Sequence, residues 1–70
     1  MRYAVVIEKA PSNFAAYVPD LPGCIATGAS VEETESLIRE AIEFHLEGLK
    51  ADGFPIPPPT SQVEYIDVPA

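Results

Sequence analysis

Two side chains of this sequence are of types that perform catalysis, and each type occurs once. Cys24 is the only cysteine and His45 the only histidine. A nucleophilic cysteine needs a nearby base to lower its pKa, and a catalytic histidine needs a second group to orient it. One cysteine and one histidine also exclude an intrachain disulfide and a zinc site of the Cys/His type. We interpret Cys24 as a small buried hydrophobe and His45 as a core or interface residue, and we expect no catalytic residue, metal or cofactor.

Carboxylates are the other candidates for chemistry, since clustered acids hold the two metal ions of many nucleases. Six of the eleven acidic residues fall in one predicted helix, mostly on its outer side: Glu32, Glu33, Glu35, Glu40, Glu43 and Glu47. Glu8 and Asp20 are left near strand ends, and two such carboxylates make a poor two-metal site. The helix acids are either a solvated face, with Glu35 paired to Arg39, or a surface that docks a partner.

The charge balance limits the kinds of partner. Eleven acidic and four basic residues give a net charge of −7, which repels phosphate backbones and attracts basic proteins. We therefore expect a basic protein partner and no direct nucleic-acid binding. Glu8 and Lys9 end the first apolar run too early for a signal peptide or membrane span, so we expect a cytoplasmic protein without membrane contact.

The length allows a single domain over residues 1–70 with a thin core. A hydrophobic content of 47% and a charged content of 21% are typical of a folded chain. Because neither a disulfide nor a zinc site is available, association is the remaining way to supplement such a core. The sequence therefore predicts a homo-oligomer, at least a dimer.

The residue pattern predicts strands over residues 2–8, 14–18 and 24–27, followed by a helix. Ser30 and Glu33 form a capping box at the start of this helix, and Gly53 is the expected stop. One side of the helix is apolar: Val31, Leu37, Ile38, Ala41, Ile42, His45 and Leu49. Residues 55–59 are proline-rich, and we interpret them as a stiff crossover in preference to a polyproline ligand.

Residues 62–68 alternate in polarity again and predict a fourth strand. A right-handed crossover would place this strand beside the first and parallel to it. The expected fold is therefore α+β, with the order β-β-β-α-β, a sheet order of 3-2-1-4 and one helix on one face. The other face of the sheet would be bare, which again favours self-association.

Three stretches together resemble the HicB antitoxin family: MRYAVVIEK, VPDLPGCIATG and HLEGLKADGFPIPPP. The resemblance covers essentially the whole chain, and the PDLPGC turn is its most specific part. It implies a partial ribonuclease-H-like fold and a partner, since HicB proteins silence HicA toxins, which are small basic ribonucleases that cleave mRNA. Many HicB antitoxins also carry a C-terminal DNA-binding module, for which these 70 residues leave no room, so we expect no DNA binding.

We therefore predict a HicB-like antitoxin that is not an enzyme and that neutralises a HicA-type toxin by masking its RNA-binding or active surface. The candidate contact residues are Asp20, Leu21, Glu40, Glu43 and Glu47. Asp20 and Leu21 belong to a Pro/Gly turn that is either a contact loop or a rigid corner of the fold. The alternative function is an orphan oligomeric domain without a toxin, and a weaker one is a metal-dependent nuclease.

Overall fold

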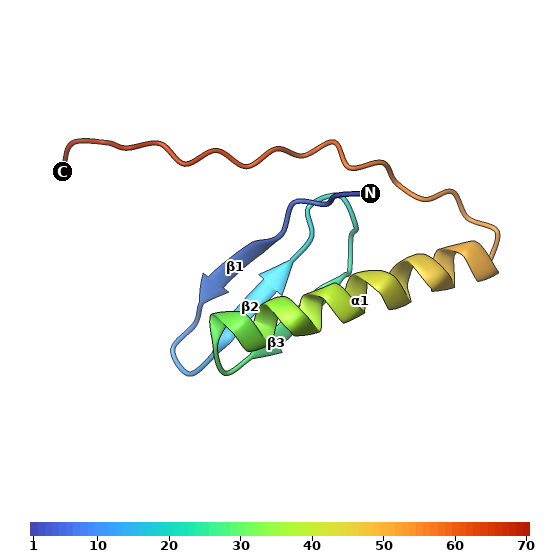
Figure 1. Cartoon of the computed structure of the whole chain (residues 1–70), viewed down its shortest axis with the longest axis horizontal. Coiled ribbons are helices and arrows are strands. Elements are labelled where there is room, and N and C mark those ends of the chain that lie inside the picture. Colours follow the sequence, from blue (N-terminus) through green and yellow to red (C-terminus); the bar gives the residue numbers. More distant parts are fainter.

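Three short antiparallel strands form the sheet of this protein (Figure 1). The computed structural model describes residues 1–70 and contains β1 (Val6–Lys9), β2 (Phe14–Tyr17) and β3 (Ile25–Gly28) in the order β1-β2-β3. Val6 pairs with Tyr17, and Tyr17 pairs with Ile25, so these three side chains share one face of the sheet. The first strand begins later than predicted, because residues 2–5 have no neighbouring strand.

The turn between β2 and β3 is closed by its own backbone. The amide of Leu21 donates to the carbonyl of Val18 at 3.0 Å, and the amide of Cys24 donates to the carbonyl of Leu21 at 3.1 Å. Gly23 has a φ of 84°, a conformation that favours glycine. This closed turn directs Leu21 and Cys24 into the core, which is a cluster of Ala16, Val18, Leu21, Cys24 and Ile38.

Helix α1 (Val31–Ala51) packs across one face of the sheet. Ser30 is the N-cap, and its hydroxyl accepts from the amide of Glu33 at 3.1 Å. The Glu33 carboxylate accepts in return from the amide of Ala29 at 3.2 Å, one residue earlier than in a standard capping box. Gly53, with a φ of 73°, follows the helix, as predicted.

The buried side of α1 differs from the predicted one at its first two turns. Thr34 and Ile38 are the buried residues of the helix, whereas Val31 and Leu37 are exposed. The hydroxyl of Thr34 donates to the carbonyl of Ser30 at 2.7 Å, which satisfies it without water. A threonine with an internal hydrogen bond can therefore face the sheet, and hydropathy alone misplaced it.

The predicted fourth strand does not form, so the expected sheet order 3-2-1-4 is reduced to its 3-2-1 part. Residues 62–68 are extended but pair with no strand, and all of them are exposed. Figure 1 shows the chain running back past β1 after the helix and continuing beyond it. The alternating pattern thus specified an extended conformation. To become a strand of the sheet, this segment would also have to lie beside a free strand edge, and it does not.

Candidate partner-binding surfaces

Asp20 fastens the chain that follows the helix to the turn after β2. Its Oδ2 accepts from the amides of Thr60 and Ser61 at 3.0 and 2.9 Å. Its Oδ1 accepts from the hydroxyls of the same residues at 3.0 and 2.8 Å. Both oxygens of this predicted contact residue are therefore engaged within the chain.

The hydrogen bonds from Thr60 and Ser61 also lower the pKa of the Asp20 carboxyl. The backbone hydrogen bond from Ser61 is the main cause that lowers the pKa of this carboxyl from its usual 3.8, and the other bonds from Ser61 and Thr60 add to it. Desolvation opposes them. The charged form is favoured because all four bonds are accepted by the carboxylate.

Leu21 and Cys24 lie in the core. Leu21 has 0% of its surface exposed, so it offers no area to a partner, and we drop it from the candidate contacts. Cys24 is also buried, and desolvation raises the pKa of its thiol. The neutral thiol is thus favoured, as in a cysteine that packs as a small hydrophobe.

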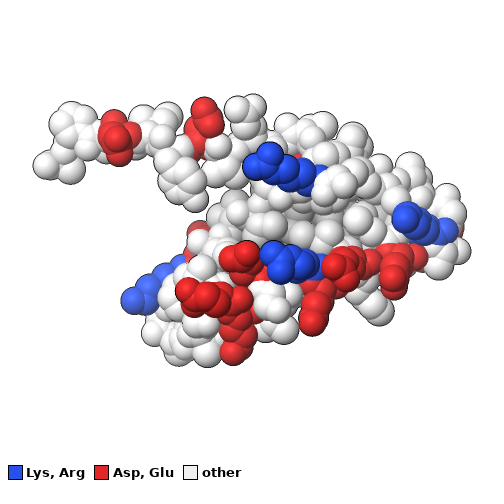
Figure 2. Space-filling view, in the orientation of Figure 1, with Lys and Arg blue, Asp and Glu red and all other residues white.

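The remaining predicted contacts lie on the solvent side of α1. Glu40, Glu43 and Glu47 are all exposed, and we call them the acidic face. Figure 2 shows carboxylates gathered along this helix. The predicted pair of Glu35 and Arg39 is present, with Oε1 and Nη2 3.4 Å apart, but both side chains are mostly exposed and contribute little stability.

A shallow apolar groove runs between α1 and β3, and we call it the β3 groove. Its two adjoining hollows have volumes of about 420 and 570 Å³. Four large apolar side chains on it are exposed, Phe44 at 79%: Ile25, Leu37, Phe44 and Phe54. Glu40 lines the same groove, so one edge of the acidic face adjoins apolar surface. His45 is half-buried in its wall.

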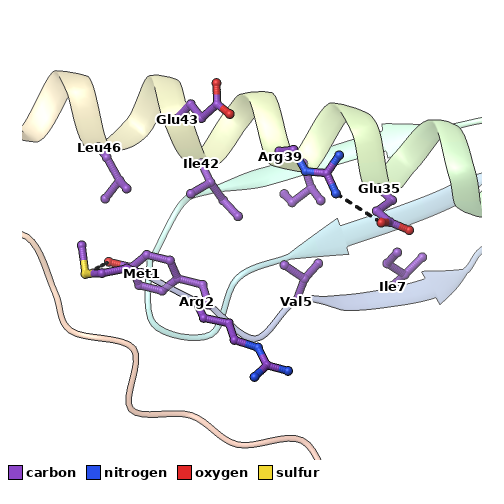
Figure 3. A pocket seen from close by; sticks show the side chains of 11 residues that line it. Met1, Arg2, Val5, Ile7, Glu35, Arg39, Ile42, Glu43 and Leu46 are labelled. Carbon is purple, nitrogen blue, oxygen red and sulfur yellow. Dashed lines mark hydrogen bonds and ion pairs between the residues drawn. The ribbon is translucent and has the colours of Figure 1, made fainter.

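A second groove lies between α1 and β1, and we call it the β1 groove (Figure 3). Its volume is about 680 Å³. Apolar side chains of α1, of β1 and of the residues before β1 line it: Tyr3, Val5, Ile7, Ile38, Ile42 and Leu46. Figure 3 shows Val5, Ile7, Ile42 and Leu46 pointing into it. Arg2, Arg39, Glu35 and Glu43 form its polar rim.

Sequence reasoning missed both grooves and the bonds of Asp20. Phe44 could have been found, because it is a large aromatic residue outside the apolar side of the helix projection and next to Glu43. Thr60 and Ser61 gave no comparable signal, since hydroxyl residues after prolines are common in loops. Only the fold brings them to Asp20, 40 and 41 residues earlier.

These features define a small α+β domain whose most conspicuous surface features are two apolar grooves and an acidic helix face. In the described chain, no three His, Cys, Asp or Glu side chains are grouped so as to hold a metal ion. None of its helices has the length and apolar character that a membrane span requires.

A family model described as HicB_like antitoxin of bacterial toxin-antitoxin system matches residues 3–70. The chain therefore belongs to the HicB-like antitoxin family. It is 36% identical over 69 residues to a 14.9 kDa protein from the rep-hol intergenic region of Haemophilus phage HP1, covering 99% of this chain and 52% of the phage protein. It is 49% identical over 47 residues to a UPF0150 protein of Helicobacter pylori, covering 67% of this chain and 65% of that protein.

Among solved structures, the chain is similar to one described as HicA3 and HicB3 toxin-antitoxin complex. The TM-score is 0.73 at 35% identity, and the match covers 84% of this chain and 70% of the other. The family and the α+β fold are thus established. The chain spans about half the length of the phage relative and about two thirds of the Helicobacter pylori relative.

Proposed function

We propose that this domain is an antitoxin that binds a basic HicA-type toxin, without catalysis of its own, and masks the toxin's RNA-binding or active surface. The observation that carries the proposal is the acidic face beside an exposed apolar groove, in a chain similar to one from a HicA3 and HicB3 complex. The acids would attract the toxin over a distance, and the groove would give the contact its buried area.

The β3 groove is the more suitable of the two for this partner. Its exposed Phe44 and Phe54 are aromatic anchors of the kind that dominate binding energy. In the β1 groove, Arg2 and Arg39 balance the charges of Glu35 and Glu43, so this groove offers a basic protein less electrostatic attraction. Toxin contacts are therefore proposed at Glu40, Glu47 and Phe44, with Glu43 on the flank nearer β1.

Stopped-flow binding tests the role of the acidic face. Glu40→Gln, Glu43→Gln and Glu47→Gln together change the net charge from −7 to −4 and should slow association with the toxin. The control, Glu8→Gln, Glu32→Gln and Glu64→Gln, also gives −4 but leaves this face intact. Equal rates for the two variants would show that only net charge matters, and the acidic face would no longer be the docking site.

Phe44→Ser tests the groove. Its ring is exposed, so folding should be unaffected, whereas loss of an aromatic anchor should raise the dissociation rate roughly tenfold or more.

The first experiment is co-expression with neighbouring open reading frames, followed by a pull-down. If a basic HicA-type protein is encoded there and does not bind, the orphan oligomeric domain becomes the better explanation.

We also propose that the domain associates with itself, at least as a dimer, and acts in the cytoplasm without direct contact to nucleic acid. The sheet face opposite α1 supports self-association, because Tyr17 is exposed there beside Val6. Light scattering at micromolar concentration tests it, and a stable monomer would contradict it. The net charge of −7 supports the absence of nucleic-acid contact, and measured RNA or DNA binding would contradict it.

A further inference from the structure

Residues 62–70, which we call the arm, form an extended apolar segment without a partner. Every arm residue is exposed, including Tyr65 at 95% and Ile66 at 81%. Val63 and Val68 add further β-branched residues to the same stretch. Such a segment has the propensity of a strand and none of the hydrogen bonds that a strand requires.

The base of the arm is held firmly, in contrast to the arm itself. The hydroxyl of Tyr3 donates to the carbonyl of Pro57 at 2.6 Å. Asp20 then holds Thr60 and Ser61 through four hydrogen bonds, and the prolines between 55 and 59 stiffen the connection. The arm therefore leaves the domain from a fixed point.

Its own β1 is not placed to receive it. Ser61, Gln62 and Val63 line a small hollow with Arg2, Tyr3 and Ala4, which precede β1. Beyond that hollow the arm continues straight, while β1 runs away from it (Figure 1). With its base fixed, the arm points out of its own domain.

The free edge of β1 is the matching receptor. β1 pairs with β2 on one side only, so its outer edge carries unpaired backbone groups. The β1 groove lies next to this strand and offers Val5, Ile7, Ile42 and Leu46 as apolar surface. A strand added at this edge would gain both hydrogen bonds and apolar contacts.

Charge distinguishes this occupant from a basic toxin. Three of the four basic residues lie on or near this side, with Arg2 and Arg39 in the β1 groove and Lys9 at the end of β1. The arm contains Glu64 and Asp67 and no basic residue. Glu35 and Glu43 balance the two arginines of the groove, so this side is close to neutral and repels an acidic arm less than the rest of an acidic protein would.

We propose that two copies of this chain exchange arms, so that residues 62–68 of each copy pair with the free β1 edge of the other. This inference rests on the self-association proposed above and names the segment responsible for it. The resulting sheet would have the order 3-2-1-4, with its fourth strand supplied by the partner copy. Such an exchange is a closed, symmetric interface.

Variants of the full chain test the exchange by analytical ultracentrifugation. The first variant combines Tyr65→Pro with Ile66→Pro. Adjacent amides of a strand point to opposite sides, and proline has no N–H. Whichever side of the arm pairs with β1, this double variant therefore removes one N–H donor from it. The exchange predicts at least a roughly tenfold loss in the dimer association constant. Tyr17→Thr tests the open sheet face as the rival interface, and if the exchanged arms hold the dimer it should leave the association constant unchanged. The control, Val31→Thr, alters an exposed apolar side chain of α1 outside both surfaces and should also leave it unchanged.

Hydrogen exchange of the unmodified chain supplies the second measurement. Amides 63–68 and those of the β1 edge should become protected as protein concentration rises into the dimer range. Protection that does not depend on concentration, in a monomer, would mean that the arm folds onto its own β1 and would overturn the exchange. A dimer that survives the prolines and is lost with Tyr17→Thr would also overturn it while leaving self-association intact. A chain that stays monomeric without arm protection would end both proposals.

Discussion

Asp20 and Ser61 are joined by two hydrogen bonds across 41 residues of sequence, from the serine amide at 2.9 Å and from its hydroxyl at 2.8 Å. Together with the bonds from Thr60, they fix where the chain lies after it returns from the helix. A residue predicted as a partner contact is thus, in this fold, the point to which the base of the arm is attached.

The attachment should depend on pH. Since the folded state lowers the pKa of Asp20 below 3.8, its contribution to stability is fully present above that value and is lost as pH falls through the lower, folded pKa. NMR signals of the Ser61 amide should therefore shift at acidic pH with the titration of the Asp20 carboxyl. In Asp20→Asn this acid transition should be absent, and proteolysis after residue 59 should be faster at neutral pH. An unchanged cleavage rate would show that the prolines alone hold this segment.

The hydroxyl of Tyr3 makes the second attachment, and its removal should cost a measurable amount. Tyr3→Phe leaves the Pro57 carbonyl without its 2.6 Å donor in a partly buried place, so we expect a loss of about 1 kcal/mol in the free energy of unfolding. Tyr65→Phe is the matched control, because that ring is almost fully exposed. Urea denaturation measures both variants, and equal midpoints would show that the Tyr3 bond adds no net stability.

Leu21→Ala should lower the free energy of unfolding far more than substitutions in exposed turns usually do. Loss of a fully buried leucine costs about 2–5 kcal/mol, and the whole chain has roughly 4–10 kcal/mol on a per-residue basis. Phe44→Ala removes a larger side chain from an exposed helix position and should stay within about 0.5 kcal/mol of the parent. Circular dichroism during denaturation checks both, and a mild effect at Leu21 would mean that the turn can open.

The features that the sequence predicted correctly are local ones. Ser30 and Glu33 are three residues apart, so their capping interaction needs only helical backbone. Gly23 and Gly53 both adopt the positive φ that turns and helix ends require. The helix, its limits and three of the four predicted strands likewise follow from patterns among residues that are close together in the sequence.

The features that could not be predicted depend on distant contacts. Residues 62–68 carry the alternation of a strand, but pairing needs an edge within reach, and their pattern contains no information about where β1 runs. Leu21 stands between turn-forming residues, and only the closed turn shows that its side chain points inward. Among the predicted contacts, Glu40, Glu43 and Glu47 were placed correctly on an exposed face, because helical periodicity alone decides that position.

Substitutions of two glycines, Gly28 and Gly48, test how tightly the first turn of α1 packs on β3. A Cβ at Gly28 would lie 2.6 Å from the hydroxyl oxygen and 2.9 Å from the amide nitrogen of Thr34. Because Thr34 is fully buried and starts the helix contact, Gly28→Ala should lower stability by about 1–3 kcal/mol. A Cβ at Gly48 would meet nothing within 4 Å, so Gly48→Ala in the same helix should raise stability by about 0.5–1 kcal/mol.

Adding Thr34→Ala to Gly28→Ala separates the two clashes. It removes the hydroxyl but keeps the amide nitrogen, so the double variant should remain less stable than Thr34→Ala alone. Thermal unfolding of the four variants, with Gly48→Ala as the control for glycine removal, measures this difference. If Gly28→Ala proved as stable as the parent, β3 and the first turn of α1 would have to move apart at little cost. The close contact between Gly28 and Thr34 would then not be what sets the position of the helix on the sheet.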